Sequence, residues 1–126
     1  MRLPPAALAL ALAAPAAARI INCQGSTLCQ FFGKGTAREL ADYARRLDPA
    51  RQYRNGEHVG CSLDGVCAFV QGSARGAPGA LITRLAPRIV AHGCRVCGSV
   101  PLGDENGGGE LTFNYVSLPA CYFNLC

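Results

Sequence analysis

The chain has 126 residues, 16% of them charged, and a formal net charge of +4. This length fits one domain. A charge balance this mild does not indicate a nucleic-acid-binding protein, which typically carries a strong basic patch. We therefore expect no nucleic-acid partner.

The first eighteen residues predict a secretory signal peptide. After a short charged start, residues 6–14 form an apolar run of Ala and Leu, and residues 16–18 are the small residues that signal peptidase recognises. The run is too short for a transmembrane helix, which takes ~20 apolar residues. We predict cleavage of residues 1–18, and a secreted, extracellular protein with a single domain at residues 19–126. That domain has eleven Arg or Lys and eight Asp or Glu residues.

All eight cysteines lie in the predicted mature domain. An even number of cysteines in an oxidising compartment predicts a framework of four disulfides. The Cys-x-x-Cys pair Cys94 and Cys97 could instead be redox-active or form half of a zinc site. The first alternative lacks a thioredoxin-like βαβ context, and secretion argues against reduced zinc ligands. We expect structural disulfides, and neither a metal nor a cofactor.

A first helix is predicted to begin at Thr36. Thr36 and Glu39 match a capping box, in which the hydroxyl accepts from the Glu39 backbone N–H and the carboxylate reaches back. The following apolar residues form one stripe along a helix: Leu40, Tyr43, Ala44 and Leu47. The helix should end at Asp48, because the residue before a proline avoids the helical conformation.

A second helix is predicted over residues 79–92. Its inward side chains should be Leu81, Ile82, Leu85 and Ile89. Pro87 removes a backbone donor and costs about 3 kcal/mol unless the helix kinks or starts later. Gly93 is suited to a left-handed C-cap. We interpret His92 as a capping or packing residue at the helix end.

A hairpin is predicted from residues 58–62 and 66–71. A two-residue turn at Asp64 and Gly65 would place Ser62 opposite Cys67. A three-residue loop with a left-handed Gly65 places Cys61 opposite Cys67 instead. Directly opposed Cβ atoms lie about 4.5–5.5 Å apart, which is close to disulfide geometry. We therefore favour a Cys61–Cys67 disulfide.

Further strands are predicted at residues 20–23 and 110–116, the latter from strict alternation of apolar and polar residues. Residues 103–109 read as a polar loop. Its acidic residues could touch calcium, but their spacing fits no EF-hand. With His58 and His92 as the only histidines and no recognisable catalytic pattern, we expect no enzyme.

Four phrases of the sequence resemble one protein family. They are Ile21-Asn22-Cys23-x-Gly25-Ser26 with Cys29, Ala68-x-Val70-Gln71, His92-Gly93-Cys94-Arg95-Val96-Cys97-Gly98-Ser99-x-Pro101-Leu102, and Gly109-x-Leu111-Thr112-x-Asn114-Tyr115-Val116. They are similar to the smut-virus killer toxins of the KP-four type, which identifies the chain as a cellular fungal homologue. The resemblance implies a disulfide-rich α+β fold, an α/β sandwich in which two helices pack on one face of an antiparallel sheet. We expect about five strands.

The resemblance also implies two long-range disulfides, Cys23–Cys94 and Cys29–Cys97. Each closes a loop of ~70 residues, worth about 4 kcal/mol in the loop-entropy model. The family prototype has ten cysteines, and this chain lacks the one in the first helix that would match the partner of a C-terminal cysteine. We therefore expect Cys121 and Cys126 to pair with each other in a tail that the prototype lacks.

In function, the resemblance implies a secreted toxin that inhibits the growth of competing fungi by blocking calcium channels, with no enzymatic step. Its partner would be a membrane calcium channel of the target cell, and we expect a monomer. Positive side chains would compete with calcium for channel carboxylates. The candidate target-binding residues are Arg45, Arg46, Arg51, Arg54 and Arg95.

Two observations keep other interpretations open. The arginines also fit an ordinary solvated face. In addition, Val59 stands nearest to a position where the family prototype carries a lysine implicated in activity. The alternative is a secreted effector or interaction protein that uses the same scaffold against a host plant target, because a fold does not by itself fix a function.

Overall fold

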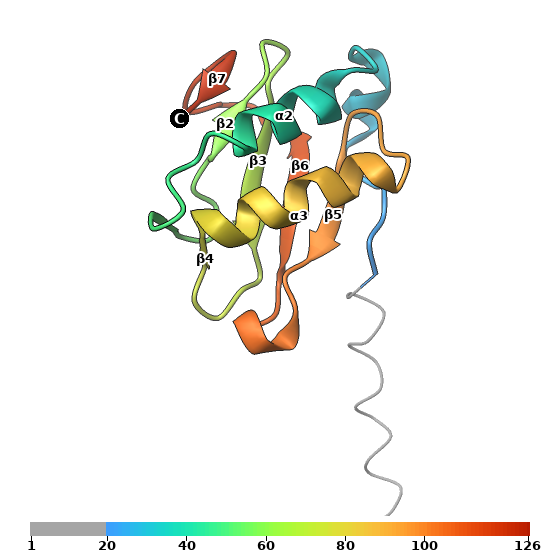
Figure 1. Ribbon diagram of the computed structural model, residues 1–126. Coiled ribbons are helices and arrows are strands. Elements are labelled where there is room, and N and C mark those ends of the chain that lie inside the picture. The colour runs from blue at the N-terminus through green and yellow to red at the C-terminus, as the bar shows by residue number, and fades with distance from the viewer. Residues whose placement is uncertain (1–19) are drawn as a thin grey trace, which may run out of the picture.

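The computed structural model describes residues 20–126, and the predicted signal peptide at residues 1–18 lies outside them (Figure 1). The helices are α2 (Thr36–Ala44) and α3 (Gly79–Ala91), and the 3₁₀ turns are η2 (Thr27–Phe31) and η3 (Asp104–Asn106). The strands are β1 (Gln52–Tyr53), β2 (Gly60–Cys61), β3 (Val66–Gln71), β4 (Ala77–Pro78), β5 (Gly98–Pro101), β6 (Glu110–Tyr115) and β7 (Asn124–Leu125).

Five strands form one antiparallel sheet in the order β5-β6-β3-β2-β7. Figure 1 shows α2 and α3 lying side by side across one face of this sheet. β1 and β4 form a separate two-stranded antiparallel sheet, which the sequence did not predict. The expected disulfide-rich α+β fold is therefore confirmed. Within residues 20–126, no helix is long and apolar enough to cross a membrane.

A single apolar core lies between the helices and the sheet. Side chains alternate between the two faces of a strand, so every second residue of β3 and β6 points toward the helices. The largest fully buried apolar side chains are Leu40, Val59, Val66, Val70, Ile82, Ile89, Val100, Leu111 and Phe113. The inward faces predicted for both helices are therefore confirmed, except that Tyr43 is only half-buried.

The start of α2 differs from the prediction. Gly35 is the N-cap and provides no side-chain bond, while Thr36 is already in the first turn. The Thr36 hydroxyl donates to the Gly33 carbonyl at 2.7 Å, and the Glu39 carboxylate accepts from the Tyr43 hydroxyl. Because both side chains have other partners, the predicted capping box does not form. The helix also ends earlier than expected, at Ala44.

The end of α3 matches the prediction. Gly93 has a φ of 106°, and its N–H donates to the Val90 carbonyl at 2.9 Å. The Cys94 N–H donates to the Ile89 carbonyl at 3.2 Å, which completes a Schellman motif. Pro87 lies inside the helix on an exposed face, and α3 continues through it. The motif turns the chain sharply from α3 toward β5.

The β2–β3 hairpin has the three-residue loop. Cys61 lies directly opposite Cys67. Gly65 has a φ of 89°, and its N–H donates to the Ser62 carbonyl at 3.1 Å. A left-handed glycine at the third loop position is typical of this hairpin class.

The N-terminal strand prediction was wrong. Residues 20–23 form no strand, and a single bridge joins Asn22 to Ser99 of β5. After this bridge the chain leaves the sheet and continues into η2, which begins at Thr27. The other predicted strand, at residues 110–116, is β6 and ends one residue earlier, at Tyr115.

Four disulfides join the described chain, and no cysteine in residues 20–126 is free. The pairs are Cys23–Cys94, Cys29–Cys97, Cys61–Cys67 and Cys121–Cys126. These are the same pairs as those expected from the sequence. The first two fasten the segment before α2 to the turn between α3 and β5.

The start of α3 gives a test of the packing. A Cβ added at Gly79 would overlap the Asp48 carbonyl oxygen and lie 3.4 Å from the Pro49 Cα. We expect Gly79→Ala to destabilise the protein by about 1–3 kcal/mol, as overpacking does, although alanine is the better helix former. Guanidinium unfolding with the disulfides intact measures this.

The control is Gly33→Ala, because a Cβ at Gly33 meets nothing within 4 Å. It should change the free energy of unfolding by less than about 1 kcal/mol. Equal stability of the two variants would contradict the close contact between Gly79 and the Asp48 carbonyl.

Candidate functional site

The candidate arginines come from two parts of the fold. Arg45, Arg46, Arg51 and Arg54 lie in one continuous segment, residues 45–54, which runs from the end of α2 through β1. We call this the arginine segment. Arg95 lies in the turn between α3 and β5, between two disulfide-bonded cysteines.

These two parts lie at opposite ends of the helix pair. The Ala37 N–H near the start of α2 donates to the Arg95 carbonyl at 3.0 Å. At the end of α2, the Ala44 carbonyl accepts from the Thr83 hydroxyl near the start of α3 at 2.7 Å. The helices are therefore antiparallel, and α2 alone is about 13 Å long. The structure does not gather all five arginines into one site.

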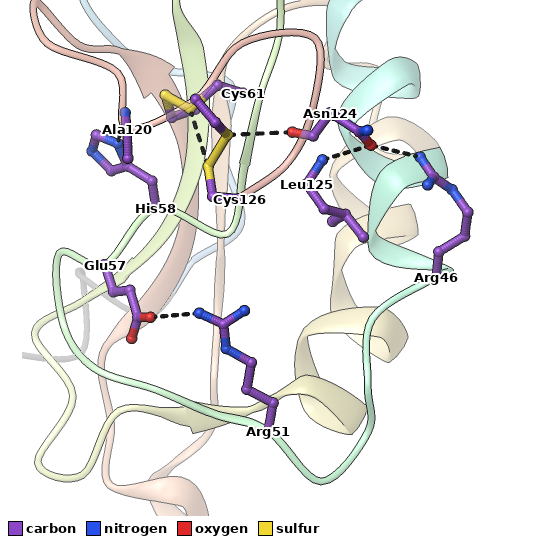
Figure 2. Close-up of a disulfide and its surroundings, with 11 residues drawn as sticks. Arg46, Arg51, Glu57, His58, Cys61, Ala120, Asn124, Leu125 and Cys126 are labelled. Carbon is purple, nitrogen blue, oxygen red and sulfur yellow. Dashed lines mark hydrogen bonds and ion pairs between the residues drawn. A yellow bond between two sulfur atoms is a disulfide. The ribbon is translucent and has the colours of Figure 1, made fainter.

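Arg51 is held by an acidic and an aromatic partner. Its Nη2 lies 2.8 Å from Glu57 Oε2 (Figure 2). Its guanidinium lies 4.4 Å from the centre of the Tyr53 ring. The other Glu57 oxygen accepts from the Arg54 backbone N–H at 3.0 Å. This backbone bond first, and then Arg51, hold the pKa of Glu57 below its usual value. The charge of Arg51 is largely compensated within the protein.

Arg46 is fixed against the C-terminal tail. Its Nη2 donates to Asn124 Oδ1 of β7 at 3.4 Å (Figure 2). Its guanidinium lies 5.5 Å from the Tyr43 ring centre. Burial, followed by the hydrogen bond to Glu39, raises the pKa of Tyr43 to about 12. Because the Tyr43 hydroxyl stays protonated well above physiological pH, the Tyr43 ring contacts Arg46 as a neutral group and does not compensate its charge.

The other arginines are exposed and weakly engaged. Arg45 lies 3.5 Å from Asp42, and both side chains are exposed, so this pair contributes about 0–1 kcal/mol. In residues 20–126, no ion pair is seen for the Arg54 and Arg95 side chains. Of the five candidate arginines, these two are therefore the most available to an acidic partner.

A shallow hollow of about 460 Å³ lies beside Arg95. Its walls are residues 23–27, 29–30 and 93–97, from the two segments joined by the long-range disulfides. Gly25 belongs to this wall, where a Cβ would lie 2.7 Å from the Cys97 Cβ. The hollow therefore has a covalently braced frame, with a cation at its edge.

Val59 lies in the core. It is 2% exposed, its N–H donates to the Ala68 carbonyl at 2.8 Å, and its carbonyl accepts from the Cys126 N–H at 2.9 Å. The C-terminal residue thus covers the backbone at this position. The side chain at position 59 is not available to a partner.

The sequence and fold features agree with one protein family. The chain matches the family Kp4 over residues 6–117. It is 34% identical over 102 residues to the KP4 killer toxin of Ustilago maydis P4 virus, in an alignment that covers 77% of this chain and 80% of the toxin. The chain belongs to the Kp4 family. The resemblance seen in the cysteine phrases is confirmed, and this Kp4 protein is a killer-toxin-like protein.

The Kp4 match ends at residue 117, before β7 and the Cys121–Cys126 disulfide. The tail therefore adds a strand to the sheet beyond the matched region. Sequence reasoning missed the contact of Asn124 with Arg46, because no local pattern links residues 78 positions apart. It also missed Glu57, although an acidic residue close to Arg51 and Arg54 was a usable signal.

The pKa of Glu57 predicts how this Kp4 protein responds to acid. A carboxyl whose folded pKa is lowered stabilises the fold at pH values above its unfolded pKa, and that stability is lost as the pH falls through the folded value. We expect Glu57→Gln to remove at most about 1 kcal/mol at pH 7, because the pair is solvent-exposed. The difference from wild type should vanish below the folded pKa.

Guanidinium unfolding of both proteins from pH 7 to pH 2 measures this difference, and other carboxyls cancel in the subtraction. A difference that stays constant across this range would contradict the role of Glu57 as an ionised partner.

Proposed function

We propose that this Kp4 protein is a secreted toxin that inhibits the growth of competing fungi by binding the outer mouth of a calcium channel in the target cell membrane. No catalytic step is involved. The observation that carries the proposal is the match to the family over residues 6–117, with the KP4 killer toxin as a relative. Secretion is supported by four disulfides, which persist in oxidising compartments, and by the predicted signal peptide.

The mechanism rests on cations that the protein does not neutralise itself. Cation channels select their ions with rings of carboxylates, and a rigid cation can compete for such a ring. Arg54 and Arg95 are exposed and form no ion pair within residues 20–126. Arg95 is the more rigidly held, because both neighbouring cysteines are bridged. Arg51 is the weaker candidate because Glu57 already compensates its charge.

A specific observation favours the second candidate, a secreted effector with a plant target. Val59 stands nearest to the position where the family prototype carries a lysine implicated in activity, and its side chain is buried, so Val59 presents no cation. A target that differs from that of the viral toxin would be compatible with this change.

Growth inhibition tests the proposal. The oxidised, secreted protein is added to a panel of fungi with and without excess calcium. We expect inhibition that calcium relieves, since calcium would compete with the protein for the channel carboxylates. Inhibition that is indifferent to calcium would contradict the channel mechanism, and inhibition of no strain would favour the effector.

Charge substitutions test the assignment of residues. We expect Arg54→Gln and Arg95→Gln each to raise the inhibitory concentration at least about tenfold, which corresponds to ~1.4 kcal/mol of binding energy. The matched control is Arg84→Gln, because Arg84 is exposed on α3 outside both groups. Equal effects of all three substitutions would indicate a general effect of net charge.

A further inference from the structure

Two disulfides lie in contact near the end of the chain. The Cys61 and Cys126 sulfur atoms are 3.9 Å apart, although each is bonded to a different partner (Figure 2). Their partners are Cys67 and Cys121. A sulfur of one bridge is therefore positioned next to a sulfur of the other.

Strand pairing holds these sulfurs together. β7 pairs with β2 so that Asn124 lies opposite Cys61 and Leu125 opposite Gly60. Cys126 is two residues beyond Asn124, and side chains at alternate positions share a face, so Cys126 and Cys61 lie on the same side of the sheet. The Cys126 N–H donates to the Val59 carbonyl at 2.9 Å, which fixes the last residue against β2.

The two bridges differ in access. Cys61 and Cys67 are fully buried, with 0% exposure, whereas Cys126 is exposed and Cys121 half-buried. Thiol–disulfide exchange requires a thiolate to reach a sulfur atom. An external thiol can therefore reach the tail bridge but not the hairpin bridge.

We propose that Cys121–Cys126 and Cys61–Cys67 form an exchange relay, in which a small external thiol opens the tail bridge and the chain rearranges to a Cys61–Cys126 bridge. The relay begins when the external thiolate bonds to the half-buried Cys121 sulfur and the Cys126 thiolate leaves; attack at the more exposed Cys126 instead frees Cys121, which can close the tail bridge again by expelling the external thiolate. The Cys126 thiolate then bonds to the Cys61 sulfur, and the Cys67 thiolate leaves. A second external thiolate removes the first from Cys121 as a small disulfide, so the protein gains two thiols.

The rearranged bridge spans a sequence separation of 65, against 6 and 5 for the two bridges that it replaces. In the loop-entropy model this one long loop restricts the unfolded chain about as much as the two short loops together, so the exchange keeps most of that stabilisation. In addition, a nitrogen of the His58 ring lies within 4.8 Å of the Cys61 and Cys67 sulfurs. A polar ring is therefore near the thiol released at Cys67.

The test uses the oxidised protein in reduced glutathione, followed by rapid alkylation. Cleavage at arginines and before aspartates separates Cys61 (residues 55–63) from Cys67 (residues 64–75) and from the tail (residues 104–126). We expect residues 55–63 to become linked to residues 104–126, with alkylated Cys67 on its own peptide. Alkylation of Cys121 and Cys126 with the hairpin bridge intact would overturn the relay, as would no opening of the tail bridge in the folded protein.

Two matched variants test the direction of the relay. Cys121→Ser leaves a permanent thiol at Cys126, whose sulfur is 3.9 Å from that of Cys61 and whose backbone N–H is bonded to the Val59 carbonyl. Cys126→Ser leaves the thiol at Cys121, whose sulfur is within 4.8 Å of Cys61 but which lies outside β7. We expect alkylated Cys67 in Cys121→Ser at a level at least tenfold above that in Cys126→Ser. Equal levels would overturn the proposal. If a variant does not fold, the glutathione experiment on the wild-type protein decides, and neither readout depends on toxin activity.

Discussion

The arrangement of the molecule depends on the two long-range disulfides. Cys23–Cys94 and Cys29–Cys97 span sequence separations of 71 and 68, and both end within four residues of each other after α3. Each removes about 4 kcal/mol of loop entropy from the unfolded chain. They also hold the backbone at Asn22 close to the backbone at Gly98, since a Cβ at Gly98 would lie 2.7 Å from the Asn22 carbonyl oxygen. The start of the chain, α3 and β5 are therefore held as one unit, and Arg95 is held with them.

Most of the fold could be predicted from periodic patterns of apolar residues in the sequence. The stripes at Leu40 and Ile89 placed both helices, and the alternation around Phe113 placed β6. Such patterns work because they report which face of an element is buried, and burial is the dominant stabilising term. The roles of Gly65 and Gly93 could be predicted for a different reason. Both adopt the left-handed conformation that their turns require, and glycine adopts it without steric cost.

Features that depend on competing partners were less predictable. Thr36 and Glu39 have capping-box spacing, but Gly33 and Tyr43 offer them nearer partners in the folded chain. The site shows the same limit. The sequence supplied the arginines, but not which of them the protein neutralises. That distinction depends on contacts such as the ion pair between Arg51 and Glu57, which forms only when the folded chain brings the two side chains together.

The short tail strand has a consequence for solution behaviour. A sheet edge with unpaired backbone groups is a template for association with other chains. Here β2 would be such an edge, but the two residues of β7 cover it, and the Asn22–Ser99 bridge partly covers β5 at the opposite edge. Both covering pieces lie next to disulfides, at Cys23 and at Cys126. The sheet therefore ends in β7, a strand of only two residues next to a disulfide, and so short an edge offers little template for edge-to-edge association.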